Sequence, residues 1–257
     1  MGLMDGKKAL IFGVANDHSL AWHIAEQLHR EGAQLGFTHL PPPKMENRVR
    51  KLAEPIGAKL IAPCDVTDDE QIQSVFHQAR ETMGAIDCLV HAIAFASRDA
   101  LTAPFYQTGR ADFLQAMEIS AYSLVALCRH GLECLAPGAS VLTLSYLGSV
   151  KAVPGYNVMG VCKAALESSV RYLAAELGRE KQIRVNALSA GPVRTLSSAG
   201  ISGFSKMHEH YPTKSPLARN IEPEEVGKSG LYLLSDLSSG VTGEVHYVDA
   251  GYNVIGW

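Results

Sequence analysis

Short apolar runs alternate with amphipathic segments along this chain, and this alternation limits its possible folds more than any other feature. Residues 8–12 form an apolar run that ends at Gly13, and the pattern that follows predicts a helix over 20–31, closed by Gly32. The same reading predicts further strands at 35–38, 59–63, 87–92, 140–145, 183–189 and 243–249. It predicts further helices at 44–54, 69–83, 112–135, 156–177 and 222–234.

Strands separated in this way by helical segments favour a parallel sheet, because parallel neighbours need a crossover connection. Right-handed crossovers then place helices on both faces, as in a doubly wound, Rossmann-type α/β fold with about seven strands. The chain of 257 residues contains no internal repeat or low-complexity linker. We therefore expect residues 1–257 to form a single dinucleotide-binding and catalytic domain.

Composition excludes several classes of protein. Hydrophobic residues make up 47% and the formal net charge is −3, so the chain can bury a large core but has no basic patch to attract nucleic acid or an anionic membrane. Its apolar runs are broken well before the ~18 residues that span a bilayer. Five cysteines without a Cys-x-x-Cys pair, and no signal-like N-terminus, favour a cytoplasmic protein with reduced thiols.

The ten histidines do not predict a metal site. His208 and His210 are the closest pair, and their spacing faces opposite sides of a helix. No Cys/His cluster has the spacing of metal ligands, so we expect no metal. His91, at the end of the fourth expected strand, is interpreted as a packed residue.

The turn after the first expected strand is where a dinucleotide fingerprint would lie, but it keeps only one glycine of the Gly-x-Gly-x-x-Gly pattern. Gly13 permits a tight turn, and Ser19 offers a hydroxyl near a pyrophosphate at the helix N-terminus. Ala21 is small enough for close helix–strand packing. Taken alone, the segment fits an ordinary strand–turn–helix corner equally well.

The adenosine end of a cofactor site leaves the choice between NADH and NADPH open. No acid follows the second strand, where Leu40 and three prolines stand. Lys44 and Arg48 are candidates for a 2′-phosphate or are solvated helix charges. Asp65, after the third strand, is placed to meet the adenine amino group, or else serves as a turn residue.

Tyr156 and Lys163 are seven residues apart, close to two helical turns, so a helix starting at Tyr156 would present both on one face. A phenol can then donate to a substrate oxygen while an ammonium holds the nicotinamide ribose and lowers the pKa of the phenol. This spacing occurs by chance in many helices. Its place after the fifth strand, at the carboxyl end of a dinucleotide-type sheet, favours an oxidoreductase.

These residues resemble the short-chain dehydrogenase/reductase superfamily, whose mark is Tyr-x6-Lys. Thr143 stands where the usual catalytic serine would fall, and Tyr146 precedes Tyr156 by ten residues. This pattern is similar to that of the divergent branch, the enoyl-acyl-carrier-protein reductases of bacterial and plastid fatty-acid synthesis. The similarity continues through residues 13–21, 91–95, 184–195 and 236–251, and so covers nearly the whole chain. Ala94 departs from it, since many members have glycine there.

The resemblance implies reduction of a trans-2-enoyl thioester by hydride transfer to its β-carbon, in the last reductive step of type II fatty-acid elongation. Tyr156 would donate to the enolate oxygen, and Lys163 would bind the ribose hydroxyls. Tyr146 would line the acyl pocket, although packing at a strand end is an alternative role. Cofactor contacts are implied for Gly13, Ser19, Leu20, Asp65, Val66, Ile93, Lys163, Val193, Thr195, Leu196 and Ser197. Substrate contacts are implied for Ala96, Tyr146 and Tyr156.

The resemblance further implies NADH as cofactor, with NADPH also considered, acyl carrier protein as the partner that carries the substrate, and a homotetramer. Residues 195–207 are small, polar and glycine-containing, which suits a mobile lid at about 195–210, or else a plain surface loop. Two rival functions remain. One is carbonyl or alcohol reduction, against which the missing serine argues, and the other is a regulator that binds the dinucleotide without turnover.

Overall fold

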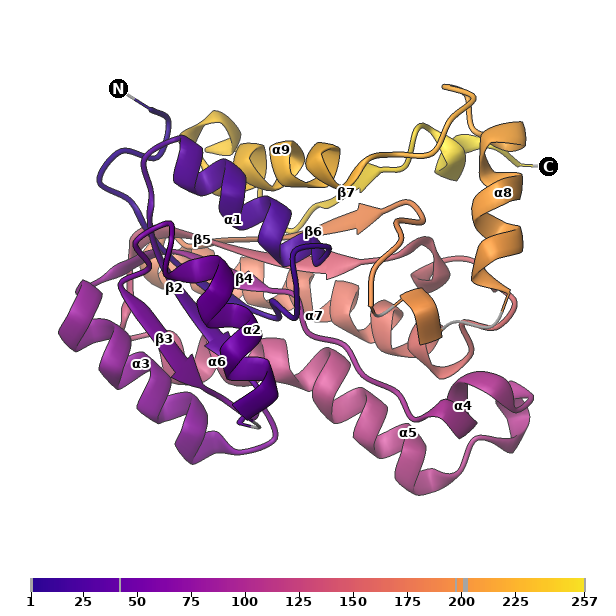
Figure 1. Cartoon of the computed structure of the whole chain (residues 1–257), viewed down its shortest axis with the longest axis horizontal. Coiled ribbons are helices and arrows are strands. Elements are labelled where there is room, and N and C mark those ends of the chain that lie inside the picture. Colours follow the sequence, from indigo (N-terminus) through magenta and orange to yellow (C-terminus); the bar gives the residue numbers. More distant parts are fainter. Residues whose placement is uncertain (1, 42, 197, 201–202, 257) are drawn as a thin grey trace.

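The computed structural model describes residues 2–41, 43–196, 198–200 and 203–256, and within them all seven strands form one parallel sheet (Figure 1). Their order is β3-β2-β1-β4-β5-β6-β7. The strands are β1 (Lys8–Phe12), β2 (Gln34–His39), β3 (Leu60–Pro63), β4 (Ile86–His91), β5 (Leu135–Ser145), β6 (Arg184–Ala190) and β7 (Val245–Val248). The predicted doubly wound, Rossmann-type sheet is confirmed.

Helices cover both faces of the sheet (Figure 1). Buried side chains of α1, α2 and α9 form one apolar cluster with the strands, and those of α3, α6 and α7 form another. The helices are α1 (Leu20–Arg30), α2 (Pro43–Ala53), α3 (Asp69–Met83), α4 (Arg98–Thr102), α5 (Arg110–Met117), α6 (Ser123–Gly131), α7 (Val158–Lys181), α8 (Phe204–Lys214) and α9 (Pro223–Leu234). Among the described residues, short helical turns include η2 (Glu118–Tyr122), η3 (Leu147–Ser149), η4 (Ser198–Gly200) and η5 (Asp236–Ser238).

Capping and proline chemistry set the starts of two helices close to where the sequence predicts them. The Asp68 side chain accepts from the backbone N–H groups of Glu70 and Gln71, so α3 starts where the sequence predicts. α2 begins at Pro43, one residue before the predicted start at residue 44. Proline is tolerated there because the first N–H of a helix has no partner within it.

One long helix was expected over residues 112–135, and this expectation is wrong at its C-terminal end. The helical stretch is interrupted by the π-helical turn η2 and ends at Gly131. β5 then begins at Leu135, before Pro137, and pairs irregularly with β4 between Ile86 and Cys88. Such a bulge accommodates a proline within a strand segment, where a regular ladder would not.

Two helices near the site were not expected as such. α4 is only five residues long, too short for a periodic pattern. α8 occupies residues that were interpreted as the end of a lid loop, and it stands apart from the sheet at one edge of the molecule (Figure 1). None of the helices in the described parts of the chain is long and apolar enough to cross a membrane. Nor does the described structure contain a group of side chains suited to a metal ion.

The packing of α1 on α9 depends on a glycine. A Cβ on Gly227 would lie 2.5 Å from the carbonyl oxygen of His23, so α9 approaches the backbone of α1 directly. Gly178 of α7 is a matched contrast, because its Cβ would meet nothing closer than the Ile183 carbonyl oxygen at 3.7 Å.

Gly227→Ala is therefore expected to lower the free energy of unfolding by a net ~1–2 kcal/mol, although alanine favours helix more than glycine does. Gly178→Ala, the control, should be neutral or stabilising. Urea unfolding followed by circular dichroism measures both. Equal stability of the two variants would contradict the role given to Gly227.

Candidate active site

The chain order reverses between β1 and β4, with β2 and β3 on one side of β1 and β4 to β7 on the other. Open parallel sheets bind ligands beyond the carboxyl ends of their strands at such a switch point. The segments after β1, β4, β5 and β6 therefore outline the candidate site. Predicted site residues follow each of these strands.

Gly13 follows β1 in a conformation that excludes a side chain. Its φ is +103°, and a Cβ would lie 2.1 Å from the carbonyl oxygen of Ala92. Ser19 precedes α1, and its Oγ accepts from the N–H groups of Ala15 at 3.0 Å and Asn16 at 3.1 Å. It makes no cap bond to α1, so it leaves the first N–H groups of that helix available to an anion. This close, uncapped turn fits a pyrophosphate.

The residues after β3 fit the turn interpretation at least as well as an adenine site. The Asp65 carboxylate accepts from the backbone N–H of Thr67 at 3.0 Å and from its hydroxyl at 2.8 Å. Val66 is buried in the core. The contacts of both residues with a cofactor remain predictions.

Tyr156 was expected to start the helix, but it lies in the turn before it. α7 begins at Val158, and Asn157 between them has φ +44°. The Asn157 side chain donates to the carbonyl oxygens of Leu101 at 2.9 Å and Ala103 at 2.8 Å, which ties this turn to the end of α4. The face shared by Tyr156 and Lys163 is thus set by a tertiary contact and not by helical periodicity alone.

The three predicted substrate contacts lie in one apolar cluster. Ala96, Tyr146 and Tyr156 all pack in it. The rings of the two tyrosines meet edge to face, with centroids 4.8 Å apart and an interplanar angle of 68°. A Cβ on Gly148 would lie 2.5 Å from the ring of Tyr156, so only glycine fits there.

Both phenols are neutral at ordinary pH. Burial raises the pKa of Tyr146 to about 12, and burial above all raises the pKa of Tyr156 further. The pKa of Tyr156 was expected to be lowered by Lys163, but burial raises it instead. Tyr156 is therefore suited to donate a hydrogen bond as an intact phenol.

Lys163 lies on α7 with only 6% of its surface exposed. Its Nζ donates to the carbonyl oxygen of Leu144 at 2.7 Å, which orients the ammonium at the end of β5. Burial lowers the pKa of Lys163 to about 8, opposed by the electrostatic influence of Cys162 and Glu167. The side chain is thus held as an ammonium close to its titration point.

His91 ends β4 and is fully buried, as expected of a packed residue. Its ring nitrogens lie 2.7 Å from the Thr143 hydroxyl and 2.7 Å from the Ser123 hydroxyl. Burial, with the charge of Lys163, lowers the pKa of His91 to about 3, so it is neutral. The hydroxyl of Thr143, which stands at the position of the missing serine, is therefore already engaged in a hydrogen bond with His91.

The loop after β6 carries several of the predicted cofactor contacts. Val193 is buried, while the Thr195 N–H donates to Ser198 Oγ at 2.8 Å and the Ser198 N–H donates to Thr195 Oγ1 at 3.1 Å. Leu196 is exposed, and Ile93, from the loop after β4, packs against the core. Leu20, at the start of α1, also packs against the core. Ser197 lies outside the described residues.

The segment predicted as a lid includes helical structure. Ser198–Gly200 forms the turn η4 and Phe204 begins α8, so a plain loop is wrong for these parts. Met207 of α8 reaches the tyrosine pair, because the Tyr146 hydroxyl donates to its sulfur at 3.0 Å. Sequence reasoning had placed Met207 in a lid but had not predicted this contact.

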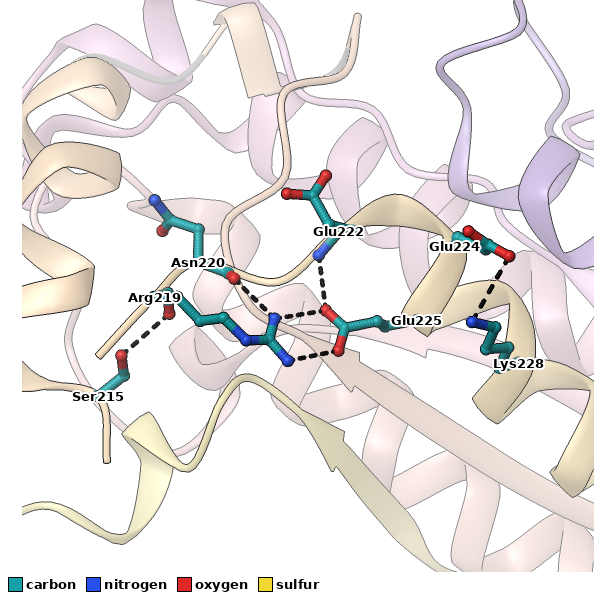
Figure 2. A network of polar contacts seen from close by, with 7 residues as sticks. All are labelled: Ser215, Arg219, Asn220, Glu222, Glu224, Glu225 and Lys228. Atoms are coloured by element: carbon teal, nitrogen blue, oxygen red, sulfur yellow. Dashed lines mark hydrogen bonds and ion pairs between the residues drawn. The ribbon is translucent and has the colours of Figure 1, made fainter. Parts of the chain in front are cut away.

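A polar network ties the connection after α8 to the start of α9 (Figure 2). Arg219 donates twice to Glu225, at 2.7 Å each, and the Glu225 carboxylate also accepts from the Glu222 N–H at 2.8 Å. Largely through Arg219, the pKa of Glu225 falls to about 2. Asn220 Nδ2 donates to the carbonyl oxygen of His208 at 3.0 Å and so links this connection back to α8.

Comparison with known proteins supplies the family. The family model described as enoyl-(acyl carrier protein) reductase matches residues 13–253. The chain is 52% identical over 255 residues to the enoyl-(acyl-carrier-protein) reductase (NADH) of Nostoc sp., covering 98% of each chain. The chain belongs to the enoyl-acyl-carrier-protein reductase family.

Solved structures of this reductase family superpose on the whole chain. The Bacillus cereus enoyl-acyl carrier protein reductase, determined with NADP+ and indole naphthyridinone, has a TM-score of 0.96 at 46% identity, with 100% of both chains covered. The Anaplasma phagocytophilum reductase, determined with NAD, has a TM-score of 0.93 at 47% identity and covers 100% of this chain and 95% of that one. The resemblance inferred from the sequence is therefore confirmed.

The structure also identifies residues around the candidate site that the sequence did not predict. Asn157 holds the turn that carries Tyr156, Gly148 makes room for its ring, and Met207 contacts Tyr146. No local pattern identifies them, since each acts through a neighbour distant in the sequence or through a backbone angle.

Proposed function

We propose that this protein reduces the carbon–carbon double bond of a trans-2-enoyl thioester, borne by acyl carrier protein, with NADH, in the last reductive step of type II fatty-acid elongation. The observation that carries the proposal is the buried pair of neutral phenols at the end of β5, with Lys163 held beside the same strand end. Membership of the enoyl-acyl-carrier-protein reductase family supports it.

The occupied hydroxyls near the site argue against carbonyl or alcohol reduction. That chemistry in the wider superfamily uses a serine at the position of Thr143. The Thr143 hydroxyl contacts His91, and the Ser145 hydroxyl donates to Glu167. Neither hydroxyl is free to assist Tyr156, whereas the second phenol, Tyr146, lies against it.

In this proposal Tyr156 donates a hydrogen bond to the thioester oxygen, on which negative charge develops when the β-carbon is reduced. A fixed donor in a dry site stabilises such charge more than water does. When bound, NADH supplies the hydride. Tyr146 lines the acyl pocket with Ala96, and the apolar cluster around them excludes water from the reacting bond.

The cofactor-binding residues are proposed from the fit of their positions to a dinucleotide. Gly13 and the start of α1, with Ser19 and Leu20, would hold the pyrophosphate, and Asp65 with Val66 would border the adenine. Lys163 would bind the ribose hydroxyls. Ile93, Val193, Thr195, Leu196 and Ser197 would border the nicotinamide end.

NADH is proposed over NADPH chiefly from the relatives, since no acidic residue, lysine or arginine stands at the very end of β2 to decide the choice. Leu40 follows β2 and is exposed, and Lys44 lies exposed on α2. The name of the Nostoc relative specifies NADH. The Bacillus cereus structure was determined with NADP+, so parallel assays with both dinucleotides are informative.

We further propose that residues 1–257 act as one domain, with a lid at about 195–210 that moves when ligand binds. The contact of Met207 with Tyr146 supports a lid, since an acyl chain entering beside Tyr146 must displace the thioether. The Arg219–Glu225 ion pair would hold the C-terminal end of the lid to α9 while the rest of the lid moves.

A homotetramer in the cytoplasm completes the proposal. An apolar groove of about 520 Å³ runs between α5, η2 and α7, lined by Leu114, Met117, Ala121, Tyr122, Val125 and Ala165 among others. Leu114 is 60% exposed and Tyr122 45%, which supports a subunit contact there. All five cysteines are free and buried, which suits a reducing compartment.

The first test is oxidation of NADH with crotonyl thioester, beside NADPH and a panel of ketones. We expect turnover with the enoyl thioester, and a kcat about 10²-fold lower in Tyr156→Phe, which loses only the donor. Tyr172→Phe, at a tyrosine 71% exposed on α7, is the matched control and should be unchanged. No oxidation with any enoyl thioester would favour the regulator, and unchanged turnover in Y156F would refute its role.

Lys163→Ala is expected to weaken NADH binding about 10-fold or more, because the buried ammonium no longer meets the ribose. Fluorescence titration without thioester measures the dissociation constant. Lys228→Ala, at a lysine 63% exposed in its side chain, should bind normally. Equal affinity in the two variants would show that Lys163 does not hold the ribose.

Leu114→Lys is expected to shift the protein from tetramers to smaller species, since a charge would be buried in the proposed contact. Sedimentation velocity measures this, with Leu3→Lys, at a leucine 48% exposed near the N-terminus, as control. A monomeric wild-type protein would refute the tetramer.

A further inference from the structure

The buried carboxyl group of Glu167, near Lys163, takes no part in the chemistry proposed above. Glu167 is 4% exposed and lies one helical turn after Lys163 on α7. Its Oε1 accepts a hydrogen bond of 2.5 Å from Ser145 Oγ. Burying a carboxylate costs free energy unless hydrogen bonds and an opposite charge compensate it, so this placement requires a physical reason.

Glu167 and Lys163 together tie α7 to the end of β5. Lys163 Nζ donates to the carbonyl oxygen of Leu144, and the next residue, Ser145, donates to Glu167. Tyr146 follows immediately. Two consecutive strand residues are therefore held by two side chains from one helix face, directly before a residue of the proposed acyl pocket.

The titratable groups around Glu167 and Lys163 are uncharged near neutral pH. The other titratable groups that face them are His91 of β4, Tyr156 before α7, Cys162 of α7 and Tyr247 of β7. Burial lowers the pKa of His91 to about 3 and raises that of Cys162 to about 11. It also raises the pKa of both tyrosines. Glu167, one helical turn from Lys163, acts to raise the pKa of Lys163 against the effect of burial, and the other groups around the two are uncharged near neutral pH.

Resting on the reductase function proposed above, we infer that Glu167 is a positioning residue of this active site: it holds the end of β5 through Ser145, and its charge keeps the buried Lys163 an ammonium. The charge acts across the low-dielectric interior, where Coulomb interactions are stronger than in water. The hydrogen bond and the charge are separable, because a glutamine retains the acceptor and loses the charge.

The test is the pH dependence of NADH binding, measured by fluorescence without thioester. In the wild-type protein, affinity should fall as the pH rises through about 8, where Lys163 loses its proton. In Glu167→Gln the same fall should occur about one pH unit lower, since the ammonium loses its stabilising neighbour. An unmoved transition in E167Q would refute the role of the charge.

Two further variants separate charge from hydrogen bonding. Glu167→Asp keeps the charge and should keep the transition near its wild-type pH. Ser145→Ala keeps the charge and removes the donor, so the transition should stay in place while KM for crotonyl thioester rises. A transition that moves equally in S145A and E167Q, or an unchanged KM in S145A, would contradict the inference.

The outcomes also distinguish this inference from the proposed function. A wild-type protein that does not bind NADH would refute the reductase and the inference that rests on it. NADH binding and turnover that persist in E167Q with an unmoved transition would refute only the role of Glu167.

Discussion

The attachment of α7 to the end of β5 is the constraint on which the rest of the site depends. Lys163 and Glu167 each make a short hydrogen bond to consecutive residues of the strand, and both side chains are almost fully buried. Because these polar groups have little access to water, losing either bond would leave a buried group unsatisfied. The strand end, and Tyr146 that follows it, are therefore held in one position.

A second set of contacts brings the opposite wall of the site to this fixed edge. Asn157 ties the turn of Tyr156 to α4, and Met207 of α8 contacts Tyr146. α8 is in turn joined to α9 by the exposed network around Arg219 and Glu225 (Figure 2). The fixed edge is buried and polar, whereas the Arg219–Glu225 pair that joins α8 to α9 is exposed.

Periodicity predicted the sheet well because strands buried on both faces read as continuous apolar runs, and caps such as Asp68 mark helix starts. It failed where long-range contacts set the backbone. A helix starting at Tyr156 was the natural reading, but Asn157 adopts a positive φ and bonds to α4. Likewise, the small polar residues before α8 gave no sign of a helix, whose Met207 contacts the distant Tyr146.

The sequence by itself determined the order of the strands, the proposed Tyr146–Tyr156–Lys163 set and the family, because these depend on local patterning and on residues near one another in the chain. Only the tertiary structure decided that the phenols stay protonated, that His91 hydrogen-bonds the Thr143 hydroxyl, and that Glu167 is buried against Ser145. Those properties arise from burial and from partners on other elements. Desolvation and long-range hydrogen bonds exist only once the sheet and helices have packed.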